Sequence, residues 1–148
     1  MKILKINFEG NYETEIRKIR NAVFTKEQRV NSNADFDGED KNAIQILIKM
    51  NDQFAGTGRM LTDGHIGRIA VLKLFRGNGV GQKIIETFIK IAHKKNMKRV
   101  YLGSQKHAIS FYEKLGFKEY GSFYEEEGIM HIHMEKLNKL KKKDRSHR

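Results

Sequence analysis

The sequence predicts a mixed α/β fold of the α+β kind, built around one mixed sheet. Strand-like and helical periodicities alternate along the chain, which is the first indication. A glycine-rich turn between an apolar strand-like run and a strongly amphipathic helix is the second. The third is the length of 148 residues, which is common for a protein with one hydrophobic core. We therefore expect a single domain over residues 1–138 and a basic C-terminal tail over residues 139–148.

The first half of the chain predicts four strands and one helix. The expected strands are residues 2–8, 43–50, 54–61 and 65–74. Residues 12–28 are expected to form a helix, because their apolar side chains make one stripe, namely Ile16, Ile19, Val23 and Phe24. The polar and acidic residues 31–42 predict a loop. Asn51-Asp52 and Asp63-Gly64 predict turns between strands, and the second is a good hairpin signal.

The second half begins with the clearest helix, residues 80–95. Its apolar side chains recur at helical spacing and are Val80, Ile84, Ile85, Phe88, Ile91 and Ala92. A short strand at residues 99–103 precedes a further helix, one face of which carries Ala108, Phe111, Tyr112 and Leu115. Strands at residues 118–124 and 129–136 follow. This order places the glycine turn at the C-terminal end of a strand, where ligands gather in open α/β sheets.

Composition argues against several kinds of protein. No apolar run approaches the ~18 residues needed to cross a bilayer, and the first residues lack a signal-peptide core, so we expect a cytoplasmic protein. The chain has no cysteine, which removes disulfides, thiol nucleophiles and the classical structural zinc sites. His131 and His133 would point to one face of a strand, but no third ligand is apparent, so we expect no metal.

The net charge of +11 invites comparison with nucleic-acid-binding proteins. Residues 136–148 contain seven basic residues and one acidic residue, which accounts for +6 of that charge. The sequence has no aromatic-interleaved basic strand and no recognition-helix pattern. Solubility and a general attraction for polyanions therefore explain the charge better than specific nucleic-acid binding does.

The turn Arg76-Gly77-Asn78-Gly79-Val80-Gly81 is suited to an anion. Small residues let the backbone curl so that successive N–H groups point to one place, and a helix N-terminus attracts negative charge. Two common phosphate loops do not fit. A Walker loop requires Gly-Lys followed by Ser or Thr, whereas Lys83 follows Gln82, and the dinucleotide fingerprint requires a small residue at position 82.

Downstream lies the segment Ala108-Ile109-Ser110-Phe111-Tyr112-Glu113-Lys114-Leu115-Gly116-Phe117. Together, Arg-x-x-Gly-x-Gly and this Ala-x-x-Phe-Tyr-x-Lys-x-Gly-Phe segment resemble the GNAT superfamily of acyl-CoA-dependent N-acetyltransferases. The resemblance implies the GNAT fold, with a central, mostly antiparallel mixed sheet of about six or seven strands flanked by about four helices. It also implies acetyl-CoA as co-substrate.

The resemblance implies a site for acetyl-CoA in two parts. The pyrophosphate would bind the turn formed by Arg76, Gly77, Asn78, Gly79, Val80, Gly81 and Gln82, with a charge-assisted contact from the arginine. Strands four and five splay apart in this fold, so the edge Ile69-Ala70-Val71 would offer amides to the thioester oxygen and to pantetheine. Gln105 stands where relatives often have an asparagine that binds pantetheine, and its side chain is longer.

Two side chains are predicted to carry the chemistry. Attack of an amine on a thioester forms an oxyanion, which needs a pre-aimed donor, and releases a thiolate, which gains from a proton donor. Tyr112 resembles the family's general acid, although packing on a helix face is the alternative role. His65 lies where several relatives carry a catalytic glutamate, and an imidazole could accept a proton directly or through water. An exposed strand start is the alternative for His65, and many relatives use water chains.

The acceptor site is predicted from two further similarities. Glu126-Glu127-Gly128-Ile129-Met130-His131 resembles a bacterial branch of the superfamily with Glu-x-Gly-Ile-Pro-His, and Met130 replaces the proline. The patterns Arg20-x-x-Val23-Phe24-x-x-Glu27-Gln28-x-Val30 and Asp35-Phe36-Asp37-x-x-Asp40 are similar to the same branch. Acidic residues near the reactive end of the donor would attract a cationic amine. The residues expected at the acceptor site are Glu27, Gln28, Asp37, Glu126 and His131, and a solvated loop is the alternative for the acidic segment.

The sequence thus predicts a cytoplasmic N-acetyltransferase that moves an acetyl group directly from acetyl-CoA to a primary amine of a small molecule or peptide. A non-catalytic acyl-CoA sensor of the same fold is the alternative, and a basic nucleic-acid-binding module is a weaker one. Homodimers are common in the family, and the sequence decides neither dimerisation nor the identity of the amine.

Overall fold

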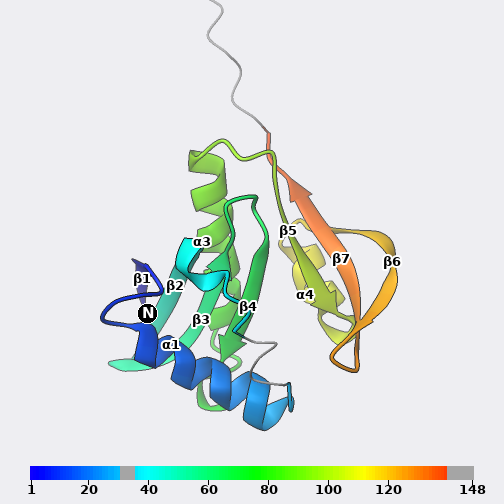
Figure 1. Cartoon of the computed structure of the whole chain (residues 1–148). Coiled ribbons are helices and arrows are strands. Elements are labelled where there is room, and N and C mark those ends of the chain that lie inside the picture. The colour runs from blue at the N-terminus through cyan, green and yellow to red at the C-terminus, as the bar shows by residue number, and fades with distance from the viewer. Residues whose placement is uncertain (31–35, 140–148) are drawn as a thin grey trace, which may run out of the picture.

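The computed structural model describes residues 1–30 and 36–139. Asp35 and residues 140–148 of the expected tail lie outside this described part. Seven strands form a four-stranded sheet in the order β1-β2-β3-β4 and a three-stranded sheet in the order β5-β7-β6. All hydrogen-bonded neighbours within these sheets are antiparallel, which confirms the predicted, mostly antiparallel α+β fold (Figure 1). The strands form two sheets that touch at one parallel bridge, and not the one continuous mixed sheet that was expected.

The elements follow the predicted order closely. In chain order they are β1 (Lys2–Ile6), α1 (Glu13–Arg20), the π-helical segment η1 (Asn21–Glu27), β2 (Ile44–Met50), β3 (Gln53–Met60), β4 (Ile66–Val71), α3 (Val80–Lys94), β5 (Arg99–Gln105), α4 (Ile109–Lys114), β6 (Lys118–Glu126) and β7 (Ile129–Leu137), with short 3-10 turns at Asp40–Asn42, Lys73–Phe75 and Lys106–Ala108. Asn51 and Asp52 both have positive φ, at 49° and 62°, as the tight hairpin between β2 and β3 requires.

Helices α1 and α3 cover opposite faces of the first sheet (Figure 1). Strand β2 is buried on both sides, because Leu47 packs in the cluster under α1 while Ile46 and Ile48 pack in the cluster under α3. Helix α3 lies close to β3, because Gly56 and Gly58 of β3 have no side chains to keep it away. A Cβ on Gly58 would come within 2.5 Å of Ile69 Cδ1 and 2.7 Å of Ile84 Cγ2.

The helix expected over residues 12–28 is α-helical only in its first half. Its second half is the π-helical segment η1, and the backbone N–H of Gln28 donates to the carbonyl of Val23 at 3.0 Å. A π-helical turn rotates the side chains that follow it, and such turns are frequent at functional sites. Periodicity at 3.6 residues per turn could not reveal this change of register.

The two sheets meet at the start of β4 and then separate. His65 and Tyr101 form a single parallel bridge, in which the Tyr101 N–H donates to the Gly64 carbonyl at 3.1 Å. Gly64 has φ of 94°, and a Cβ there would collide with the carbonyl of Arg99. Beyond the bridge β4 and β5 diverge (Figure 1), as the family resemblance implied.

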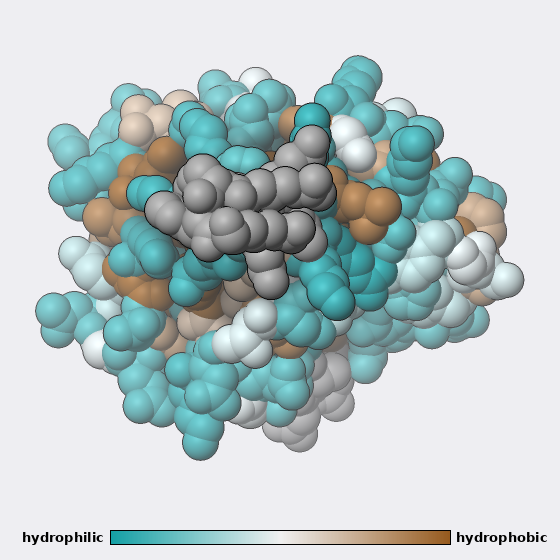
Figure 2. Space-filling view, turned by 90° about the horizontal axis from the view of Figure 1, so that it is seen from above, coloured by the Kyte–Doolittle hydropathy of each residue, from teal (hydrophilic) through white to brown (hydrophobic). Residues whose placement is uncertain are grey.

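Hydrophilic side chains cover most of the face shown in Figure 2, and apolar groups there are small and separate. Large apolar side chains are exposed singly, such as Leu74 at 78% and Leu137 at 68%. No helix in the described ranges is long and apolar enough to cross a membrane.

Candidate active site

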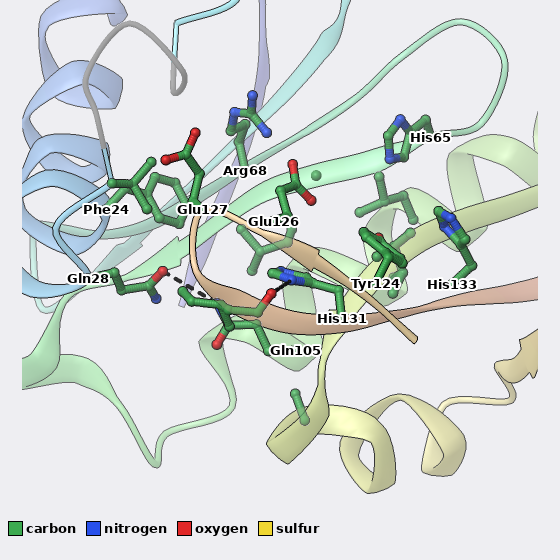
Figure 3. A pocket seen from close by; sticks show the side chains of 18 of the residues that line it. Phe24, Gln28, His65, Arg68, Gln105, Tyr124, Glu126, Glu127, His131 and His133 are labelled. Atoms are coloured by element: carbon green, nitrogen blue, oxygen red, sulfur yellow. Dashed lines mark hydrogen bonds between the residues drawn. The ribbon is translucent and has the colours of Figure 1, made fainter. Parts of the chain in front are cut away.

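A cavity of about 650 Å³ opens where β4 and β5 diverge. Its walls come from β4, β5, the β6–β7 hairpin, the start of α4 and the end of η1 (Figure 3). Of the predicted site residues, those that line it are Gln28, His65, Ile69, Gln105, Tyr112, Glu126 and His131. The structure therefore gathers predicted catalytic, cofactor-binding and acceptor-binding residues from distant parts of the chain around one space.

The glycine turn lies outside this cavity, at the start of α3. Gly77 and Gly79 have φ of 80° and 79°, and a Cβ on either would meet nothing within 4 Å. The first helical bond runs from the Lys83 N–H to the Gly79 carbonyl at 3.0 Å, so the N–H groups of Val80, Gly81 and Gln82 precede the helical ladder. The turn thus has donors and open space, which fits a pyrophosphate.

Arg76 is held beside this turn by two partners. Its Nε donates to the Val71 carbonyl at 3.0 Å, and its terminal nitrogens donate to the two carboxylate oxygens of Glu27 at 2.6 and 2.7 Å. The hydrogen bond from Arg76 lowers the pKa of Glu27. Glu27 was predicted at the acceptor site, but the structure places it with the glycine turn and not among the residues of the cavity.

The edge of β4 has an irregular backbone where it faces the cavity. Arg68 has φ of 52°, and the β3–β4 register shifts between Thr57 and Arg59. Such a bulge redirects the following residue, here Ile69, whose side chain lines the cavity. Ala70 points the other way and is buried in the cluster under α1.

Tyr112 serves packing and lines the cavity at the same time. Its ring meets Phe117 edge-on at a centroid distance of 5.8 Å. Burial raises the pKa of Tyr112 to about 12, so its hydroxyl stays protonated near neutral pH. A protonated hydroxyl at the cavity can donate a hydrogen bond or a proton.

His65 lines the cavity beside the bridge between the two sheets. Its ring stacks on Tyr101 at 4.7 Å, and its backbone N–H donates to Asp63 Oδ1 at 3.1 Å. The Tyr101 hydroxyl donates to the same carboxylate. Burial lowers the pKa of His65, and the attraction of Asp63 offsets only part of this. His65 is therefore neutral near pH 7 and a weaker base than a free histidine.

Gln28 and Gln105 were predicted in different subsites, and they are hydrogen-bonded to each other. The Gln105 Nε2 donates to Gln28 Oε1 at 3.3 Å, and Gln105 Oε1 lies 2.7 Å from His107 Nε2. The pair joins the end of η1 to the end of β5 at the cavity wall (Figure 3).

Asp37 and Asp40 have arginine partners. Arg59 donates to Asp37 at 2.9 and 2.7 Å, and Arg68 adds a contact at 3.1 Å. The fully buried Arg20 binds Asp40 at 2.9 and 2.7 Å. Asp37 is not among the cavity-lining residues, and its charge is balanced by these guanidinium groups. Glu126 and Glu127 line the cavity instead, so the acidic side chains near an acceptor come from the β6–β7 hairpin.

Sequence reasoning missed Tyr124 and Gly103. The Tyr124 ring stacks between His133 at 4.5 Å and His131 at 5.6 Å, and its hydroxyl lies against Gly103, where a Cβ would collide with it. A glycine inside a predicted strand is a signal for such a close approach. His131 and His133 share one face of β7, and the described residues hold no group of three metal-ligating side chains.

The family model for an acetyltransferase (GNAT) domain matches residues 12–138. The Bacillus subtilis protein YyaT is 34% identical over 142 residues, which covers 92% of this chain and 95% of YyaT. The Escherichia coli protein ElaA is 36% identical over 126 residues, which covers 79% of this chain and 82% of ElaA.

Solved structures agree with these matches. The crystal structure of Escherichia coli ElaA has a TM-score of 0.79 at 31% identity and covers 91% of this chain and 98% of that chain. The crystal structure of an aminoglycoside 6'-N-acetyltransferase complexed with coenzyme A has the same fold, with a TM-score of 0.72 at 15% identity over 93% of this chain and 97% of that chain. Sequence and fold together show that the chain belongs to the GNAT acetyltransferase family.

Proposed function

We propose that this protein transfers the acetyl group of acetyl-CoA directly to a primary amine. The supporting observation is that the edge of β4 at the cavity and the glycine turn follow each other along the chain. The diverging edge of β4 faces the cavity, and the same strand leads into the glycine turn, to which Arg76 ties it through the Val71 carbonyl. A ligand with an anionic end and a thioester end fits this arrangement.

The turn would hold the donor by its phosphates. The N–H groups of Val80, Gly81 and Gln82 would donate to the pyrophosphate, and the guanidinium of Arg76 would add charge. The Ile69 amide would polarise the thioester carbonyl, and Gln105 would bind the pantetheine arm on the opposite wall. Oxyanion donors of this kind lower the activation barrier by about 3 to 4 kcal/mol.

The reaction needs a proton donor and a proton acceptor. Tyr112 would protonate the departing thiolate, since its raised pKa keeps the hydroxyl protonated. His65 is the base that the sequence predicted, and it lies at the cavity. The chain has no cysteine for a thiol-linked acetyl intermediate, which favours direct transfer in a ternary complex.

Calorimetric titration with acetyl-CoA, free CoA and ATP tests the donor site. We expect one-to-one binding of acetyl-CoA and CoA and much weaker binding of ATP. Gly79→Val should weaken acetyl-CoA binding at least tenfold, because a branched side chain would occupy the space where phosphate approaches. Gly38→Val is the matched control, since Gly38 also has positive φ and open surroundings. Equal affinity of both variants for acetyl-CoA would contradict the site.

Thiol release from acetyl-CoA in the presence of a panel of primary amines tests the activity. Product analysis by mass spectrometry should find the acetylated amine in proportion to released CoA. Binding of acetyl-CoA without acetylation of any amine would instead support the acyl-CoA sensor.

A further inference from the structure

His131 has one ring nitrogen fixed by the backbone. Its Nδ1 lies 2.7 Å from the carbonyl oxygen of Ile129, two residues earlier in the same strand. A carbonyl oxygen can only accept a hydrogen bond, so Nδ1 carries the hydrogen. The neutral ring therefore has its lone pair on Nε2, the nitrogen able to accept a proton.

The orientation of this ring is also fixed from the side. His131 stacks on Tyr124 at 5.6 Å with an angle of 23° between the rings. Tyr124 is in turn held between His131 and His133, with its hydroxyl against Gly103. A base that is oriented by a backbone bond and a stacked ring matches the arrangement in which a third group positions a catalytic histidine.

His131 lies beside Gln105, one of the groups proposed to hold the donor. It is the cross-strand partner of Gln105 in the β5–β7 pair, and Figure 3 shows it between Gln105 and Tyr124. His65 lies on the far side of the cavity, next to the strand bridge, with its ring flat on Tyr101. Glu126, on the hairpin beside His131, also lines the cavity and can stabilise a positive charge there.

We propose that His131, and not His65, is the catalytic base of the acetyl transfer, an inference that rests on the proposed function. The amine nitrogen attacks the thioester carbon, and the new C–N bond leaves a positive charge on nitrogen. Nε2 of His131 takes one proton from that nitrogen and becomes part of an imidazolium. The C–S bond then breaks, Tyr112 protonates the sulfur, and solvent restores both side chains to their starting protonation states.

The test compares His131→Asn with the wild type on amines of decreasing basicity, namely ethylamine, glycinamide and aminoacetonitrile. Asparagine retains an N–H donor that can reach the Ile129 carbonyl but has no basic nitrogen. We expect kcat/KM for ethylamine to fall about 100-fold or more, with unchanged affinity for acetyl-CoA. The loss should shrink as amine basicity falls, because a less basic nitrogen gives up its proton to water more readily.

Two further variants complete the experiment. His131→Gln places an amide near the position of Nε2 without basicity and should lose as much activity, while His93→Asn on α3 should keep wild-type rates. A loss below fivefold in both His131 variants, or an equal loss for all three amines, would overturn the assignment and leave the acetyltransferase function standing. Failure of the wild type to acetylate any amine would overturn the proposed function and this inference with it.

Discussion

Arg76 and Glu27 form a two-point ion pair, at 2.6 and 2.7 Å, that connects the end of η1 to the glycine turn of α3. Both side chains are about 40% exposed, so the pair can open without disturbing the core. It also occupies the guanidinium that the phosphates of acetyl-CoA would use. In the proposed donor site, the phosphates would therefore compete with the Glu27 carboxylate for Arg76.

Glu27→Gln should tighten acetyl-CoA binding about two- to fivefold, because it removes this competitor while keeping the side-chain shape. Titration calorimetry at low salt measures the change. Glu13→Gln is the matched control, since Glu13 pairs with Arg17 at 2.9 Å on α1. Weaker binding in Glu27→Gln would mean that the carboxylate positions Arg76 for the phosphate.

Asp40→Asn should destabilise the fold by about 3 kcal/mol, because the buried Arg20 guanidinium would lose its counter-charge. Thermal unfolding should show a Tm lower by roughly 10 °C. Glu39→Gln changes an exposed neighbouring carboxylate and should leave Tm nearly constant. Comparable Tm values for both variants would show that the buried pair contributes little.

The same carboxylate predicts the response to acid. Burial raises the pKa of Asp40, but Arg20 and Arg59 lower it by more, and the net pKa lies below the ordinary value. A depressed pKa adds stability that is complete above the unfolded pKa of about 3.9 and is lost as the pH falls through the folded pKa. Unfolding curves between pH 7 and pH 2 should show a steeper loss below about pH 4 in the wild type than in Asp40→Asn. Parallel curves would contradict this.

Tyr112→Phe should lower kcat about 100-fold and change acetyl-CoA affinity less than twofold, since phenylalanine keeps the contact with Phe117 and loses only the hydroxyl. Because the pKa of Tyr112 is about 12, wild-type kcat should show no loss from its ionisation between pH 7 and 10. Tyr12→Phe, beside α1, controls for loss of a hydroxyl elsewhere. Equal kcat in Tyr112→Phe and the wild type would limit Tyr112 to packing.

Gly58→Ala should destabilise the protein by about 1 to 3 kcal/mol, because the added Cβ would press on the buried Ile84 between β3 and α3. Gly67→Ala is the same change at a strand position where the Cβ meets nothing within 4 Å, so its Tm should match that of the wild type. If both variants unfold at the wild-type temperature, the close packing of α3 on β3 is not required.

The sequence by itself determined the order of the strands and helices, apart from the π-helical segment η1, and the family. Local periodicity was sufficient to predict the strands and α3. Side chains two positions apart share one face of a strand, and side chains three and four positions apart share one face of a helix. Residues 76–81 could be predicted as a turn because glycine adopts positive φ there, as Gly77 and Gly79 do, and the binding of phosphate by this turn stays a prediction. Tyr112 and Gln105 were found through motif position, and both do line the cavity.

Only the tertiary structure decided which of these residues meet. Pairing of Arg76 with Glu27 spans 49 positions, and that of Arg59 with Asp37 spans 22, so no local pattern predicts either. The π-helical register of η1 and the divergence of β4 from β5 have no counterpart in the hydrophobic periodicity, so only the structure revealed them. The bond from His131 Nδ1 to the Ile129 carbonyl spans only two positions, but it depends on the orientation of the ring, which stacks on Tyr124 of the neighbouring strand, so the structure was needed to find it.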